Sequence, residues 1–184
     1  MELDQEDCSF KTLGQIVRKG AEWAQVPQIL GDRMLVVQDL EENLPKSFFL
    51  WDYRTSRFCQ WGVPRSNGFS RAVLTDEYIL WITPQSAYAW DISQLEMVPF
   101  SEGAFSQCPL VSPHWVVRGC WPFEQCQTLR VSALPLLRER KTNSVSLEFS
   151  GPKAYSGQQM IARYQVTVTR EPGGITGALE VVGG

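Results

Sequence analysis

From Ile29 onward, short apolar runs alternate with turn-forming residues along the chain. The strongest run spans residues 78–82, and others lie at residues 34–37, 48–51, 87–90, 115–117, 128–131, 145–149, 160–168 and 178–182. Several runs alternate with a period of two, as a strand with one buried face does. Proline and glycine stand between the runs, and because proline is excluded from central strands, they divide the chain into short strands. The pattern predicts an all-β fold with no long helix after residue 30.

Two stretches share one order of elements, which indicates an internal repeat. An aspartate-containing turn leads into an apolar strand, and a later aromatic strand ends in Trp-Asp. The two copies comprise residues 30–37 with 49–53, and residues 74–81 with 88–92. Trp90 lies 39 positions after Trp51, and Asp76 lies 44 positions after Asp32, close to the ~40–45 residues of a four-stranded propeller blade. We expect a decayed third copy at residues 111–117 with 128–131, and a fourth at 156–162 with 165–168.

The two Trp-Asp strands resemble WD40 repeats, and the wider pattern is similar to the propeller region of fungal F-box-like proteins. The resemblance covers about residues 29–134. It implies a partial or small β-propeller of about four degenerate, four-stranded antiparallel blades. The Gly-His pair of typical WD40 repeats is absent, and residues 1–28 are too short for a whole F-box. A four-bladed propeller, a partial propeller from a shortened gene, and a stack that needs a partner to cover its edges stay open as alternatives.

The Trp-Asp pairs have a structural role in such a stack. One blade cannot bury both faces of its sheet, so neighbouring blades bury them and aromatic rings fill the space between. We therefore expect Trp51 and Trp90 to pack between sheets. We expect Asp52 and Asp91 to accept hydrogen bonds from turn amides or to hold a neighbouring polar side chain. Ligand binding by these four residues is the alternative.

The first 28 residues differ from the rest. Residues 1–9 are acidic, and the apolar residues between Phe10 and Trp23 are spaced as on a helix face, but Gly14 and Gly20 weaken a helix. The chain therefore divides into residues 1–28, loose or part of a leading blade, and residues 29–184, the propeller-like repeats.

Charge and targeting signals narrow the classes of partner. The formal net charge of the 184 residues is -3, and lysine and arginine are scattered. A protein that binds nucleic acid through phosphates needs a clustered positive surface, so we expect no nucleic-acid partner. No apolar run approaches the ~20 residues that span a bilayer, and the acidic N-terminus is no signal peptide. Five cysteines without a CxxC pair favour free thiols in a reducing compartment, the cytoplasm or nucleus.

Few residues offer catalytic chemistry. His114 is the only histidine, and it lies near Cys108, Cys120 and Cys126. These four residues match the ligand count of a Cys3His zinc site, but they lack the tight pair that usually anchors one. A cysteine nucleophile, Cys120 or Cys126 with His114, is a further alternative, while buried inert thiols are the default. We therefore expect no catalytic residue, metal or cofactor.

Turn-associated tryptophan and arginine residues are the candidates for contact with a partner. Trp61 and Trp121 each stand just before a turn, and arginines frame the first of these turns. Both residue types are enriched at binding hot spots, although tryptophan more often fills the space between blades. The candidates are Arg54, Arg57, Trp61, Arg65 and Trp121.

Together these features predict a non-catalytic module that binds a protein or peptide through loops at one end of the propeller. The resemblance implies the recognition part of an F-box-like ubiquitin-ligase system. The alternatives are a propeller that binds or hydrolyses a small ligand or sugar, and a truncated gene product without independent function.

Overall fold

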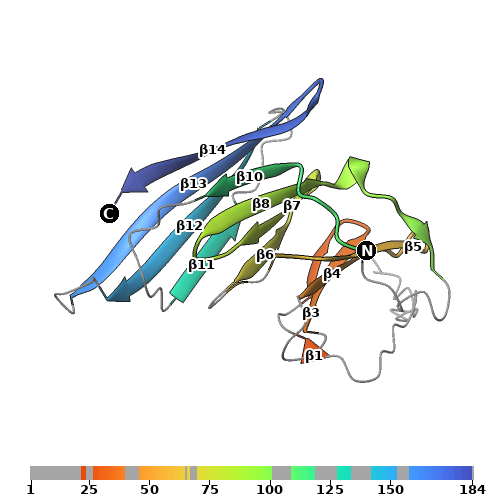
Figure 1. The fold of residues 1–184 in the computed structure, drawn as a ribbon, viewed down its shortest axis with the longest axis horizontal. Helices are drawn as coiled ribbons and strands as arrows, with labels where there is room; N and C mark the ends of the chain where they lie inside the picture. The colour runs from red at the N-terminus through yellow and green to blue at the C-terminus, as the bar shows by residue number, and fades with distance from the viewer. Residues whose placement is uncertain are drawn as a thin grey trace, which may run out of the picture.

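The structure, a computed structural model, describes residues 22–23, 27–39, 46–64, 66, 70–100, 109–118, 128–133, 142–152 and 158–183. Within these residues the chain forms antiparallel strands and one 3-10 helix, η1 (Ile92–Gln94), and no α-helix. The predicted all-β class is confirmed. The described strands form three sheets, which Figure 1 shows as successive layers from the red and orange strands through green to blue.

Sheet A is the first layer, and its strands follow one another as an antiparallel meander. It contains β1 (Glu22–Trp23), β2 (Gln28–Leu30), β3 (Arg33–Asp39), β4 (Ser47–Asp52), β5 (Arg57–Gly62) and β9 (Val98–Pro99). Strands β1 and β2 pair with two different parts of β3, and β9 pairs with the far edge of β5.

Sheet B is the middle layer and has four strands in the order β10-β8-β7-β6. They are β6 (Arg71–Leu74), β7 (Tyr78–Ile82), β8 (Ser86–Asp91) and β10 (Trp115–Arg118). Sheet C is the last layer, a meander of β11 (Thr128–Ala133), β12 (Thr142–Pro152), β13 (Gln159–Glu171) and β14 (Gly174–Gly183).

Sheet B is buried on both faces, which explains its continuous apolar sequence. All five side chains of β7 are buried. Tyr78, Leu80 and Ile82 pack against sheet C, where they meet Leu147 and Val166. The alternate residues of β7, Ile79 and Trp81, pack against sheet A. A strand covered on both faces reads as an uninterrupted apolar run.

Aromatic rings dominate the interface between sheets A and B. The ring of Phe48, on β4, makes edge-to-face contacts with Trp61, Trp81 and Trp90 at centroid distances of 5.4, 5.3 and 5.7 Å. Such contacts add about 0.5–1.5 kcal/mol each beyond the burial of apolar area. Two indole nitrogens donate to carbonyls at this interface: Trp90 Nε1 to Val111 O at 3.0 Å, and Trp81 Nε1 to Pro64 O at 3.3 Å.

Sheets A and B are also tied by the path of the chain. After β8 the chain returns to sheet A as β9, and it then adds β10 to sheet B. The amide of Gln28, on β2, donates to Ala72 O and accepts from Leu74 N, at 2.7 and 2.9 Å. This side chain thereby satisfies backbone groups along β6.

The first two predicted repeat copies occupy corresponding strands in consecutive sheets. The first copy falls on β3 and β4, and the second falls on β7 and β8. Trp51 projects from the face of sheet A opposite sheet B, where it joins Val36, Phe49 and Phe58. Trp90 projects from sheet B toward sheet A, so both rings point in the same direction through the stack.

The predictions of a third and a fourth repeat copy are wrong, because the segments of neither copy form one structural unit. The two segments of the third copy fall in different sheets, because β10 completes sheet B while β11 begins sheet C. In the fourth copy, residues 160–162 and 165–168 belong to one strand, β13, instead of two. Of the described part of residues 1–28, β1 and β2 are strands of sheet A, while the possible helix at residues 10–21 lies outside the described residues.

The two outer faces of the stack differ in chemistry. The outer face of sheet A carries the buried cluster of Val36, Phe49, Trp51 and Phe58. The outer face of sheet C alternates with its buried residues and is mainly polar; its members include Ser144, Ser146, Gln165, Thr167 and the ion pair of Arg163 with Glu148.

Close packing of sheets B and C depends on the absence of a side chain at Gly177, on β14. A Cβ atom at this position would lie 2.6 Å from Cε2 of Trp115, on β10. We therefore expect Gly177→Ala to force the indole ring from its place and to lower the free energy of unfolding by about 1–3 kcal/mol, measured by urea denaturation. Gly173→Ala is the control, because no atom lies within 4 Å of a Cβ there. Equal effects of the two substitutions would contradict this packing.

Candidate functional site at the turn end of the sheets

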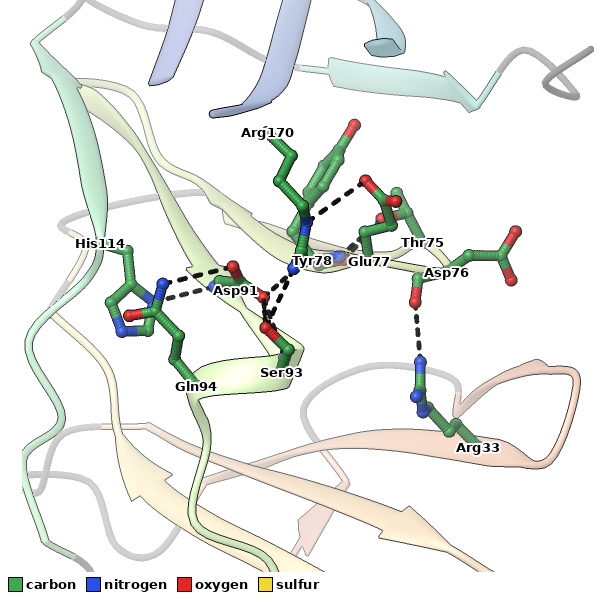
Figure 2. A network of polar contacts seen from close by, with 10 residues as sticks. All are labelled: Arg33, Thr75, Asp76, Glu77, Tyr78, Asp91, Ser93, Gln94, His114 and Arg170. Atoms are coloured by element: carbon green, nitrogen blue, oxygen red, sulfur yellow. Dashed lines mark hydrogen bonds and ion pairs between the residues drawn. The ribbon is translucent and has the colours of Figure 1, made fainter. Parts of the chain in front are cut away.

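Turns from all three sheets meet at one end of the stack, which we call the turn end. It consists of the turns β2–β3, β4–β5, β6–β7 and β13–β14 together with the segment after β8. These are residues 31–32, 53–56, 75–77, 172–173 and 92–97. Hydrogen bonds and ion pairs connect these turns across the sheets, as Figure 2 shows for sheets A, B and C. Charged groups gather here because the space between the sheets is apolar.

Asp91 is the centre of this polar network. It ends β8, caps η1, and is only 1% exposed. Its Oδ1 accepts hydrogen bonds from the backbone amide of Ser93 at 2.9 Å, from Ser93 Oγ at 2.7 Å, and from Arg170 Nη2 at 2.7 Å. Its Oδ2 accepts from Gln94 Nε2 at 3.3 Å. A buried carboxylate needs such partners to remain charged.

These contacts set the ionisation of Asp91. Burial raises the pKa of the carboxyl, but the hydrogen bonds from Ser93 and the charge of Arg170 together outweigh burial. The pKa therefore lies below its usual value, and Asp91 is a carboxylate at neutral pH. It serves as an anchor for the turn, which is the type of role that the sequence predicts for it.

Arg170 connects sheet C to this anchor. It lies near the end of β13, and its guanidinium also donates to Ser93 Oγ at 3.1 Å and lies 3.9 Å from Glu77 Oε2. Glu77 precedes β7, so Arg170 reaches two segments of sheet B. The neighbouring Tyr78 has a raised pKa, chiefly because its phenol is buried and secondarily because of the charge of Glu77.

His114 takes part in the same network as a hydrogen-bond acceptor. Its Nδ1 accepts from the backbone amide of Asp91 at 2.9 Å, and its own backbone amide donates to Ala89 O at 2.9 Å. With Nδ1 accepting, the neutral ring carries its proton on Nε2. The Asp91 carboxylate is directed toward Ser93, Gln94 and Arg170 (Figure 2). This geometry gives His114 a structural role in placing β10 beside β8.

The turns of sheet A are tied to each other and to sheet B. Asp52 Oδ1 accepts from the backbone amides of Arg54 and Thr55 at 3.1 and 3.0 Å, the hydrogen bonds that the sequence predicts. Arg54 Nη1 lies 3.2 Å from Asp32 Oδ2. Arg33 Nη1 donates to Asp76 O at 2.7 Å, which joins the first turns of sheets A and B.

The structure separates the predicted partner-binding residues. The Arg54 side chain is 78% exposed at the turn end. Arg57 is exposed and donates to Met97 O, so it also holds the segment after η1. The prediction of Trp61 as a partner-binding residue is wrong. Its side chain is 0% exposed, because its ring fills the interface between sheets A and B. Arg65 and Trp121 lie outside the described residues.

The metal and cysteine alternatives depend on residues that lie mainly outside the described ranges. Cys108, Cys120 and Cys126 are not among the described residues. Within the described ranges, no group of three or more histidine, cysteine, aspartate or glutamate residues is arranged to hold a metal ion. Cys59 is buried between sheets A and B.

Sequence reasoning missed Arg170, Ser93 and Glu77. Arg170 lies 79 positions from Asp91, and no motif or spacing connects the two. One feature of the sequence does indicate the position of Arg170. It directly precedes the Glu-Pro-Gly-Gly sequence, which is typical of a turn, so its side chain is expected at the end of a strand.

Comparisons with known proteins give no relative. No family model, curated protein or solved structure matches the chain. The part of the chain that the structure describes contains no helix long and apolar enough to cross a membrane.

Loss of the Arg170 guanidinium would leave Asp91 buried without its charged partner. We expect Arg170→Ala to lower the free energy of unfolding by about 1–3 kcal/mol at pH 7, measured by urea denaturation. The control is Arg163→Ala on the same strand, because its ion pair with Glu148 is exposed on the arginine side and should contribute less than about 1 kcal/mol.

The effect of Arg170→Ala should depend on pH in one direction. The folded-state pKa of Asp91 lies below the unfolded value of about 3.9. The stabilisation is therefore complete above that value and is lost as the pH falls through the folded-state pKa. The difference between the wild type and Arg170→Ala should shrink on acidification below about pH 4. A difference that stays constant down to the acid transition would show that the ion pair is not its source.

Proposed function

We propose that this chain is a non-catalytic binding module that recognises a protein or peptide through its turn end. The observation that carries the proposal is the cross-tied arrangement of turns from three sheets. Arg33 with Asp76 O, and Arg170 with Asp91, each join turns of different sheets. A surface held in place before binding loses less conformational entropy on association, so binding energy is not spent on ordering loops.

The exposed groups at this end suit polar recognition. Arg54, Asp76, Gln94, Glu96 and Glu171 are all exposed. They present both signs of charge on a rigid scaffold, whereas the central carboxylate, Asp91, is buried and fully engaged. Complementary charges give specificity and faster association more than raw affinity. We therefore expect a partner segment of mixed charge.

The architecture supports a propeller-like stack as the scaffold. Three antiparallel sheets pack face to face, and β6 lies beside both β2 and β11. Blades around an axis also place their first strands side by side, so this neighbourhood supports the proposal. The resemblance of the two Trp-Asp strands to WD40 repeats supports the same reading. Recognition within an F-box-like ubiquitin-ligase system is the specific role that this resemblance favours.

Site-specific photo-crosslinking tests whether the turn end contacts a partner. A photoreactive amino acid at Arg54 or Gln94 should capture a discrete protein in cells. The same group at Arg163, on the outer face of sheet C, should not, although Arg163 is similarly exposed. With the captured partner purified, Arg54→Glu should weaken binding about tenfold or more, as loss of an arginine contact at a hot spot does.

Two results would contradict the proposal. One is capture at Arg163 to the same extent as at the turn end, which would indicate contact without a defined surface. The other is wild-type affinity in Arg54→Glu together with Gln94→Ala. Ubiquitylation of the captured partner that depends on this chain would support the specific role, and its absence would remove that role but leave binding intact.

A further inference from the structure

Strand β14 is the longest open edge among the described sheets. It has ten residues and pairs only with β13, because it is the last strand of sheet C. The row of backbone N–H and C=O groups on its other side therefore faces away from the sheet. Such an edge is a template for a further strand.

The other sheet edges are short or covered. Strands β1, β2 and β9 have two or three residues, and β9 includes Pro99. Strand β6 has four residues and its backbone is engaged by Gln28. Strand β10 also has four residues. Strand β11 has six residues and lies beside β6.

Strand β14 has few of the features with which proteins protect an edge. One of them, a register shift, lies at its end, where Val182 stands between the partners of Tyr164 and Arg163. From Gly174 to Gly183 it contains no proline, lysine or arginine, and Glu180 is its single charge. Two consecutive valines, Val181 and Val182, are 72% and 62% exposed. These two side chains leave apolar surface uncovered near the end of the same edge.

We propose that two copies of this chain associate through β14, which pairs antiparallel with itself across a two-fold axis and joins two copies of sheet C into one continuous sheet. The occupant is a second copy because a strand with almost no charge is complementary to itself in this orientation. Most soluble oligomers are two-fold dimers of this isologous type.

The single charge decides between registers. An axis through Glu180 would place the two carboxylates directly opposite each other, which is unfavourable. An axis through Leu179 pairs the part of the strand from Gly177 to Val181, which precedes the register shift, and places Glu180 opposite Ala178 of the second copy. This register stays within the regular part of β14, and it sets Val181 opposite Gly177.

This register can be tested by introducing a charge at one exposed position. Ala178 and Glu180 are both exposed on the outer face of sheet C. In the dimer, Ala178→Glu would place two pairs of like charges in opposition, and Ala178→Lys would place two pairs of opposite charges together. We expect the first to weaken dimerisation about twofold to thirtyfold and the second to leave it unchanged or tighter, measured by sedimentation equilibrium of the full chain.

A second pair of variants tests the edge independently. Val181→Lys introduces a charge at the edge, and should shift the protein toward the monomer. Ile161→Lys is the matched control, because Ile161 is 47% exposed on sheet C but belongs to β13. Near-ultraviolet circular dichroism should be unchanged in all variants, since the substituted side chains are exposed.

Several results would overturn the inference. A wild-type chain that stays monomeric at all concentrations would exclude it. So would a dimer that Ala178→Glu and Val181→Lys leave intact, or one that Ile161→Lys dissociates as strongly as Val181→Lys. Because these measurements need no partner protein, their outcome is independent of the proposed function.

Discussion

The structure depends on the burial of sheet B on both of its faces. Strand β7 contributes side chains alternately to two cores, with Leu80 toward sheet C and Ile79 toward sheet A. Neither neighbouring sheet could bury its own apolar face without this strand. At about 25 cal/mol for each Å² of apolar surface removed from water, two shared interfaces hold three sheets together without any α-helix among the described residues.

An apolar interior on both sides of sheet B confines charge to the ends of strands. This explains why the polar ties gather at the turn end, where Arg33 and Arg170 reach from sheets A and C to the turns of sheet B. Asp91 can be buried there because four donors surround its carboxylate. The same ties that stabilise the stack fix the positions of the exposed side chains beside them, so stability and a defined surface have one source.

Sequence pattern predicted the features that depend on neighbouring residues. The run at residues 78–82 marks a strand buried on both faces, and the Trp-Asp pairs mark strand ends whose aspartates cap turns. Pattern failed where strand length and long-range packing decide. Strand β13 is thirteen residues long. The fourth repeat copy, placed by a period near 40 residues, wrongly divided this strand into two. Trp61 precedes a turn, yet its position opposite Phe48 in the register of β4 and β5 buries it.

The unequal outer faces of the stack bear on whether it could close into a ring. Closure would require the outer face of sheet C to pack against the outer face of sheet A, which is apolar and whose Phe49 and Trp51 are already buried. Serine, threonine and glutamine side chains on sheet C would then lose water without gaining partners, which costs free energy for each unsatisfied group. A polar outer face is instead what a terminal repeat needs in contact with water. The chemistry of this face of sheet C therefore favours contact with water over packing against the apolar face of sheet A.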